Sequence, residues 1–143
     1  MLKLIIGNKI YSTWSIRLLY LMRQLEIPHE EIFISLFTPG SKEEILKHTP
    51  SGMVPSLIDE GSTIWDSLAI VEYLNEKFPE KNIWPQDKKA RAIARSVVAE
   101  IHGGFPSNLG GACSYNLGKI FETPDLSDSA RQEISYITNQ IMT

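Results

Sequence analysis

The first eighty residues alternate between short apolar runs of the strand type and longer segments with helical periodicity. Strands are predicted where apolar residues are continuous or alternate, and helices where they recur every three or four positions. The predicted strands are 2–6, 31–37, 55–58 and 63–65, and the predicted helices are 15–26, about 41–48 and 67–78. Pro28 and Pro79 should end two of these helices, since the residue before a proline avoids the helical region. The predicted order is βαβαββα.

The pattern also predicts which residues share a face. In the strand 31–37, Ile32, Ile34 and Leu36 lie on one side. Ser41, followed three residues later by Glu44, has the spacing of a capping box and predicts the start of a short helix. The helix 67–78 should bury one apolar stripe, which consists of Ile70, Val71, Leu74 and Phe78. A βαβαββα order mixes parallel and antiparallel strands, as in an α/β domain of the thioredoxin-like type.

After residue 80 the pattern becomes helical. Residues 79–86 have the turn-rich composition of an interdomain linker, and helices are predicted at 87–102 and 129–142. The second helix lacks the glycine, proline or basic last turn that usually marks a helix end. Its apolar stripe of Ile134, Ile137 and Ile141 needs partners. We therefore expect a domain at 1–80 and an incomplete all-helical domain at 87–143, which would belong to a longer protein.

Composition argues against several classes of protein. The net charge of −3 over 143 residues gives no reason to expect nucleic acid or an anionic membrane as a partner. The single cysteine, Cys113, excludes an internal disulfide and any Cys-x-x-Cys motif, and three scattered histidines predict no metal site. The apolar run 2–6 is too short for a signal sequence or a membrane span. We expect a cytoplasmic protein without a metal.

The most informative segment is 53–67. A cis Val54–Pro55 bond at a strand entrance would turn the backbone N–H and C=O of Val54 outward, where an extended peptide could pair with them. Asp66 and Ser67 then offer a carboxylate and a hydroxyl at the positive end of a helix. These groups suit a small peptide that carries both an amino group and a carboxylate. The alternative is a simple turn proline followed by a capping pair.

These residues also carry a family resemblance. Met53-Val-Pro-Ser-Leu57, followed by Asp66-Ser-Leu-Ala-Ile-Val-Glu-Tyr-Leu74, resembles the N-terminal, thioredoxin-like domain of cytosolic glutathione transferases, over about residues 1–100. The run Tyr11-Ser-Thr-Trp-Ser-Ile-Arg17 is similar to the serine motif of the zeta-like classes and related bacterial enzymes. The resemblance implies that glutathione is the co-substrate and that the full-length protein is a homodimer.

The resemblance assigns roles to individual residues. Ser67 would bind the γ-glutamyl carboxylate of glutathione and Asp66 its ammonium group. Met53 and Val54 would make main-chain contacts whose geometry Pro55 sets, and Lys42 would meet the glycine carboxylate. Ser12 matches the serine of the zeta-like motif and would donate a hydrogen bond to the thiolate.

A thiol with a pKa of about 8.5 is mostly protonated at neutral pH, and only the thiolate is a good nucleophile. A hydroxyl donor at a helix N-terminus favours the anion. Ser12 precedes the predicted helix and fits this role, although a plain N-cap would have the same position. Tyr11 is the alternative donor. Trp14 and Thr13 stand where the maleylacetoacetate-isomerising zeta enzymes have cysteine and a second serine. Those two differences argue against isomerase activity and leave the predicted donor in place.

We therefore predict a glutathione transferase that activates the thiol of glutathione for attack on a small electrophile or for reduction of a peroxide or disulfide. The first alternative is a non-catalytic glutathione transferase-like module for interaction or regulation. The second is an oxidoreductase of the thioredoxin or glutaredoxin type, against which the absence of cysteine near Ser12 argues.

Overall fold

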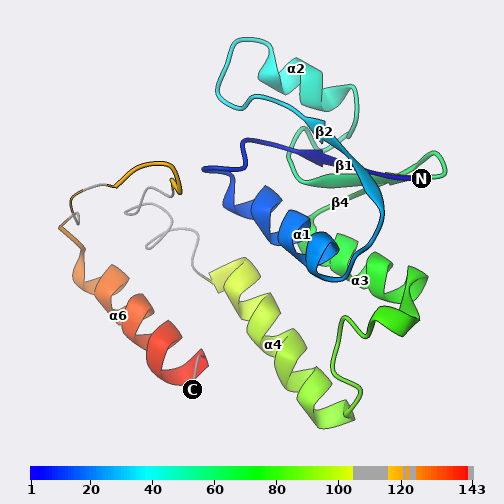
Figure 1. Cartoon of the computed structure of the whole chain (residues 1–143). Coiled ribbons are helices and arrows are strands. Elements are labelled where there is room, and N and C mark those ends of the chain that lie inside the picture. The colour runs from blue at the N-terminus through cyan, green and yellow to red at the C-terminus, as the bar shows by residue number, and fades with distance from the viewer. Residues whose placement is uncertain (105–115, 121, 123–124, 142–143) are drawn as a thin grey trace. The chain divides into compact units, whose positions relative to one another are not determined.

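The computed structural model describes residues 1–104, 116–120, 122 and 125–141, which fall into two units, Met1–Ile83 and Trp84–Thr143 (Figure 1). Cys113 lies outside the described residues. No described helix combines the length and the apolar character that crossing a membrane requires.

The first unit follows the predicted order of elements. Its elements are β1 (Leu2–Ile6), α1 (Thr13–Gln24), β2 (His29–Phe33), α2 (Ser41–Leu46), β3 (Ser56–Asp59), β4 (Ser62–Trp65) and α3 (Ser67–Lys77), with a 3-10 turn at Pro79–Lys81. The strands form one sheet in the order β2-β1-β3-β4. β1 and β2 are parallel, whereas β3 is antiparallel to both β1 and β4. This confirms the predicted α/β class and the mixed sheet.

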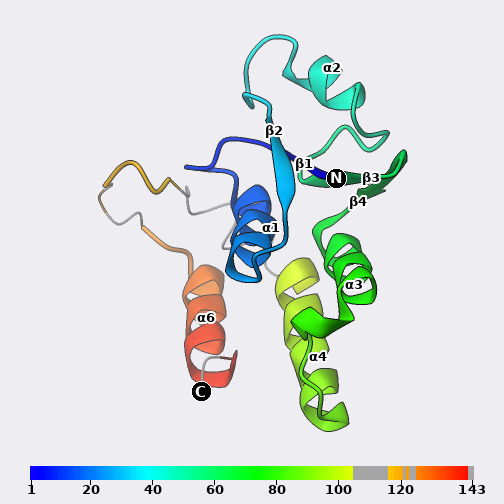
Figure 2. The same cartoon turned by 45° about the vertical axis from the view of Figure 1, so that its right-hand side comes forward.

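Helices cover both faces of this sheet, with α1 and α3 on one face and α2 on the other (Figures 1 and 2). The strands supply side chains to both faces because successive residues point to opposite sides. Leu4 and Leu57 belong to the core beneath α1 and α3, together with Ile70 and Leu74 of the predicted stripe. Ile5 belongs to a smaller core with Ile34 and with Ile45 of α2.

β2 ends four residues before its predicted end. The prediction extended it to Phe37, but Phe37 has φ +61, which is outside the extended region. The N–H of Leu36 donates to the side chain of Asn8 rather than to a neighbouring strand. The predicted face is nevertheless right, since Ile32, Ile34 and Leu36 all contribute to the core beneath α2.

The predicted capping box is wrong. Gly40, and not Ser41, is the N-cap of α2, with φ +81 and no side-chain cap hydrogen bond. A positive φ is readily adopted by glycine, which has no Cβ to clash with the backbone. The Glu44 carboxylate pairs with Lys47 and lies 3.8 Å from the ring of His48, so it does not reach back to the helix start.

The second unit contains α4 (Lys88–Gly104), α6 (Asp128–Tyr136) and a π-helical turn at Ile137–Ile141. The Ser127 side chain caps α6 by accepting the N–H of Ala130 at 3.2 Å. The predicted helix 129–142 is therefore α6 followed by the π-helical turn, and Met142 lies outside the described residues. The predicted helix 87–102 corresponds to α4, which continues through Gly103.

Candidate functional site

The register of the sheet brings the separate candidate segments to one end of it. Ile5 of β1 lies opposite Ser56 of β3, and Ser56 lies opposite Trp65 of β4. β1 ends one residue after this row, β3 begins in it and β4 ends in it. The segments 7–12, 53–55 and 66–67 therefore leave the sheet at the same end. The segment after β2 leaves there too, because Ile6 lies opposite Phe33.

The loop after β1 is held by Asn8. Its carbonyl oxygen accepts the N–H groups of Tyr11 at 3.3 Å and of Ser12 at 2.8 Å, which folds the chain into the start of α1. Its side-chain oxygen accepts the N–H of Leu36 at 2.7 Å. The loops after β1 and β2 are thus joined by one residue.

Ser12 occupies the N-cap position of α1, but its side chain makes no cap hydrogen bond. Its hydroxyl donates to the Ser15 hydroxyl oxygen at 2.8 Å, and that oxygen also accepts the N–H of Gly7 at 3.0 Å. Ser12 is 8% exposed and Ser15 is fully buried. The hydroxyl of Ser12 is therefore oriented by another side chain and not by the helix backbone.

The N-terminal turn of α1 contains no acidic side chain. The positive end of the helix dipole is thus not offset by a carboxylate in that turn. Arg17 lies over the ring of Trp14, 4.2 Å from its centroid, and burial lowers the pKa of Arg17. The helix dipole therefore favours negative charge beside Ser12.

Tyr11, the alternative donor, is oriented differently. Its hydroxyl donates to the Leu36 carbonyl at 3.5 Å, and its ring stacks on Phe37 with 6.0 Å between the centroids. Phe37 itself is 89% exposed. Tyr11 and Phe37 form an aromatic pair next to the start of α1.

The Val54–Pro55 bond is cis, as predicted. Val54 packs against the core beneath α2, and Pro55 is buried. Met53 is 65% exposed, and its N–H donates to the Ser51 hydroxyl at 3.2 Å.

Lys42 lies on α2 and reaches this segment. Its ammonium donates to the Gly52 carbonyl at 2.9 Å. A Cβ at Gly52 would lie 2.5 Å from that ammonium nitrogen, so the close approach depends on glycine. Lys42 is thus brought beside Met53, where the resemblance places the bound tripeptide.

Asp66 is the N-cap of α3 and has φ +74 and ψ 129, a backbone conformation that non-glycine residues rarely adopt. Its carboxylate accepts the N–H groups of Leu68 at 2.9 Å and Ala69 at 3.4 Å. Ser67 is the first residue of α3 and is 9% exposed. The capping role, considered as the alternative, is therefore real for Asp66. The strained φ is an additional feature that capping does not require, since N-caps ordinarily have extended backbone.

Sequence reasoning missed Gly7, Asn8 and Ser15. Ser15 could have been found from its spacing, because Ser12 and Ser15 are three residues apart across a helix start and such residues lie on the same face. Asn8 carried no comparable signal, because its partner Leu36 is distant in sequence. Among the described residues, no group of three His, Cys, Asp or Glu side chains is arranged to hold a metal.

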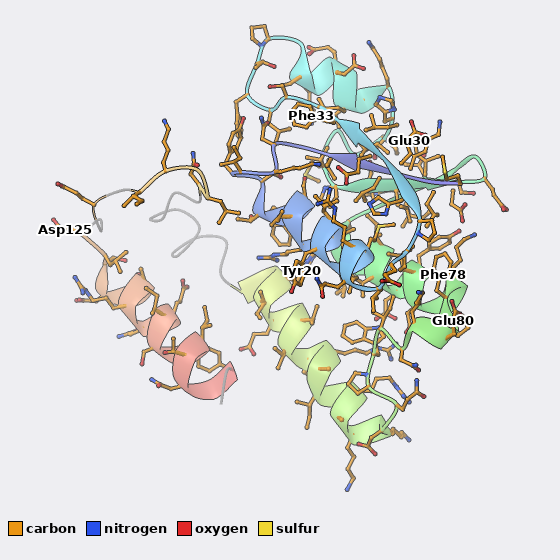
Figure 3. The ribbon with its side chains drawn as sticks, in the orientation of Figure 1. Tyr20, Glu30, Phe33, Phe78, Glu80 and Asp125 are labelled. Atoms are coloured by element: carbon orange, nitrogen blue, oxygen red, sulfur yellow. The ribbon has the colours of Figure 1, made fainter. Side chains whose placement is uncertain are left out.

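An open hollow of about 680 Å³ lies beside α2. One of its lining residues is Phe33 at the end of β2 (Figure 3). The other residues that line it are Ile34, Ser35, Thr38, Pro39, Gly40, Ser41, Glu43, Glu44 and Lys47. None of the predicted site residues lines it.

Comparison with known proteins supports this description. Residues 11–77 match the family model for the glutathione S-transferase N-terminal domain. A probable maleylacetoacetate isomerase 2 of Drosophila melanogaster is 35% identical over 103 residues, which cover 67% of this chain and 45% of that protein. Glutathione S-transferase Z2 of Arabidopsis thaliana is 28% identical over 140 residues, which cover 93% of this chain and 59% of that protein.

Among solved structures, an epsilon-class glutathione S-transferase from the housefly, Musca domestica, superposes with a TM-score of 0.66 at 30% identity. The match covers 78% of this chain and 51% of that one. The chain spans about half the length of the curated relatives it matches. From the matched N-terminal domain, the relatives and the shared fold, the chain belongs to the glutathione transferase family.

Proposed function

We propose that this chain binds glutathione at the end of the sheet where segments 7–12, 53–55 and 66–67 meet, and that Ser12 stabilises the bound thiolate. The observation that carries the proposal is the row Ile5–Ser56–Trp65, which brings these three segments together. The names of the relatives support glutathione as the ligand.

Each part of glutathione can be assigned a partner among the residues of this site. We assign the backbone of Met53 and Val54, beside the buried Pro55, to pairing with an extended peptide. Asp66 and Ser67 at the start of α3 face the ammonium and carboxylate of the γ-glutamyl end, and Lys42 beside Gly52 faces the glycine carboxylate. The sulfur then lies towards Ser12, at a helix end without an acidic residue in its first turn.

Ser12 acts as a hydrogen-bond donor and not as a base, since serine is too weakly acidic. Lowering the pKa of the thiol by two requires a preference of about 2.7 kcal/mol for the anion. One charge-assisted hydrogen bond of about 1.5–3 kcal/mol, together with about 0.3–1 kcal/mol from the helix dipole, is sufficient. Tyr11 is the alternative donor, and its hydroxyl makes a long contact of 3.5 Å with the Leu36 carbonyl.

In the whole protein, the thiolate would attack a small electrophile, forming a carbon–sulfur bond, or would reduce a peroxide or disulfide. Isomerisation, the reaction named in the Drosophila relative, is the second candidate. Trp14 argues against it, since the position that the resemblance assigns to cysteine holds a ring covered by Arg17.

The test is a calorimetric titration of the full chain with glutathione, followed by ultraviolet titration of the bound thiol. We expect binding, a thiol pKa below that of free glutathione, and a return towards the free value in Ser12→Ala. Ser127→Ala is the matched control, since it removes a true N-cap serine in the second unit. Binding without a lowered thiol pKa would instead support the non-catalytic module, and absence of binding would contradict the proposal.

A further inference from the structure

Ser15 accepts two hydrogen bonds at the start of α1. The Gly7 N–H donates to its hydroxyl oxygen at 3.0 Å, and the Ser12 hydroxyl donates to the same oxygen at 2.8 Å. Ser15 is fully buried. Gly7 packs closely against Leu36, since a Cβ at Gly7 would lie 2.4 Å from the Leu36 side chain.

The number of hydrogen bonds that a hydroxyl group can make limits the arrangements open to Ser12 and Ser15. Each serine hydroxyl donates one hydrogen bond and accepts two. In the structure the Ser12 proton is directed at Ser15, and both acceptor positions of Ser15 are filled. If Ser12 turns its proton towards a bound sulfur, the 2.8 Å contact remains a hydrogen bond only when Ser15 becomes the donor.

We infer that Ser15 is a positioning residue for the thiolate donor: the Gly7 N–H, the Ser15 hydroxyl and the Ser12 hydroxyl form a hydrogen-bond chain that ends on the sulfur. The inference rests on the proposed thiolate site. In the bound state the Gly7 N–H donates to Ser15, Ser15 donates to Ser12, and Ser12 donates to the sulfur. Each bond polarises the next, so Ser12 becomes a stronger donor than an isolated serine.

A second buried serine gives the comparison that separates this role from packing. Ser56 is also fully buried in the same unit, but its hydroxyl has no hydrogen-bond partner. Changing either residue to alanine removes one buried oxygen atom. Only the change at Ser15 removes a link to Ser12.

The experiment measures the pKa of bound glutathione's thiol by thiolate absorbance in the full-length chain. We expect Ser15→Ala to raise this pKa by about 0.3, because a neighbouring hydrogen bond strengthens a charge-assisted one by about 10–30%. Ser56→Ala should leave it unchanged. In the Ser12→Ala background, Ser15→Ala should give no further rise, since the chain no longer reaches the sulfur.

Two further variants cover the case in which Ser15→Ala does not fold. Ser15→Cys is close in volume but has a weaker donor, and it should raise the thiol pKa. Ser15→Thr keeps the hydroxyl and should preserve the parent value. If the parent lowers the thiol pKa and Ser15→Ala or Ser15→Cys titrates like the parent, the inference is wrong while the proposed function stands. If the parent itself does not lower the thiol pKa, both are wrong.

Discussion

The side-chain oxygen of Asn8 accepts the backbone N–H of Leu36 at 2.7 Å, across 28 positions of sequence. Through this bond one residue positions two loops. The carbonyl of Asn8 sets the turn that leads to Ser12, and its amide oxygen holds the loop whose Leu36 carbonyl accepts the Tyr11 hydroxyl.

Asn8→Ala should therefore weaken both stability and glutathione binding. The partly buried N–H of Leu36 loses its acceptor, which costs about 1–2 kcal/mol of unfolding free energy. Asn8→Asp keeps a side-chain oxygen at this position and should behave more like the parent. The midpoint of urea unfolding and a calorimetric titration with glutathione are the measurements. Gln24→Ala, at an exposed amide on α1, is the control, and an Asn8→Ala variant as stable as that control would contradict the prediction.

Asp66→Asn separates capping from ligand binding. Asparagine retains the side-chain oxygen that accepts from Leu68 and tolerates a positive φ, but it lacks the charge that would pair with the ammonium of glutathione. We expect glutathione binding to weaken by about 1–3 kcal/mol, with little change in stability. Ser67→Ala should weaken binding by a similar amount. Parental affinity in both variants would mean that Asp66 and Ser67 only start the helix.

Lys42→Met tests the assignment of the glycine carboxylate. The parent should bind glutathione more tightly than the glutathione analogue with a C-terminal carboxamide, and Lys42→Met should remove most of this difference. The expected effect is about 0.5–1 kcal/mol, because an exposed ion pair contributes little, and it should decrease with added salt. Lys47→Met is the matched control at the C-cap of the same helix, where the lysine pairs with Glu44. If the parent, Lys42→Met and Lys47→Met all show the same difference in affinity between glutathione and the carboxamide analogue, Lys42 is not part of the site.

The Asp59 carboxylate should make the first unit sensitive to acid. Hydrogen bonds from Lys77 at 2.5 Å and from Tyr73 at 2.6 Å lower the pKa of Asp59. A carboxyl group with a lowered pKa stabilises the folded state above its unfolded-state value of about 3.9. That contribution is lost as the pH falls through the lower folded-state pKa. Stability should therefore decrease as the pH falls below about 4.

Tyr73→Phe removes one of the two hydrogen bonds to Asp59. It should lower the unfolding free energy at neutral pH by about 1 kcal/mol. The decrease of the unfolding free energy between neutral and acid pH should also become smaller. Tyr20→Phe is the control, since Tyr20 is 65% exposed on α1 (Figure 3). Unfolding curves from neutral to acid pH provide the measurement. The same acid profile in the Tyr73→Phe and parent chains would show that Tyr73 does not influence Asp59.

The fold was predictable from sequence because its elements carry local signals. Alternating and helical periods predicted all seven elements of the first unit in order. Of the predicted stripe, Ile70 and Leu74 are buried, and Val71 and Phe78 are partly buried against the same core. The errors occur where the boundary of an element is set by a backbone conformation or by a contact with a residue distant in sequence. β2 does not extend to Phe37, whose φ is positive, and α2 is preceded by Gly40, whose φ is also positive.

The candidate site was predictable only in part for the same reason. Val54, Pro55, Asp66 and Ser67 lie within one short segment whose spacing is informative. Asn8, by contrast, binds a residue far along the chain. Ser15 is relevant to the site only through the contact of its hydroxyl with that of Ser12. Periodicity predicts that such a residue is buried but does not indicate its partner.

The carboxylates of Asp59 and Asp66 hold α3 near opposite ends of the helix. Asp66 caps the N-terminal turn at the candidate site, and Asp59 binds Tyr73 and Lys77 towards the C-terminal end. The helix that begins at Ser67 is thus also held by an ion pair at its other end, near the β3–β4 turn. Natural variation at Asp59 or Lys77 is therefore expected to alter ligand affinity without changing any residue that contacts the ligand.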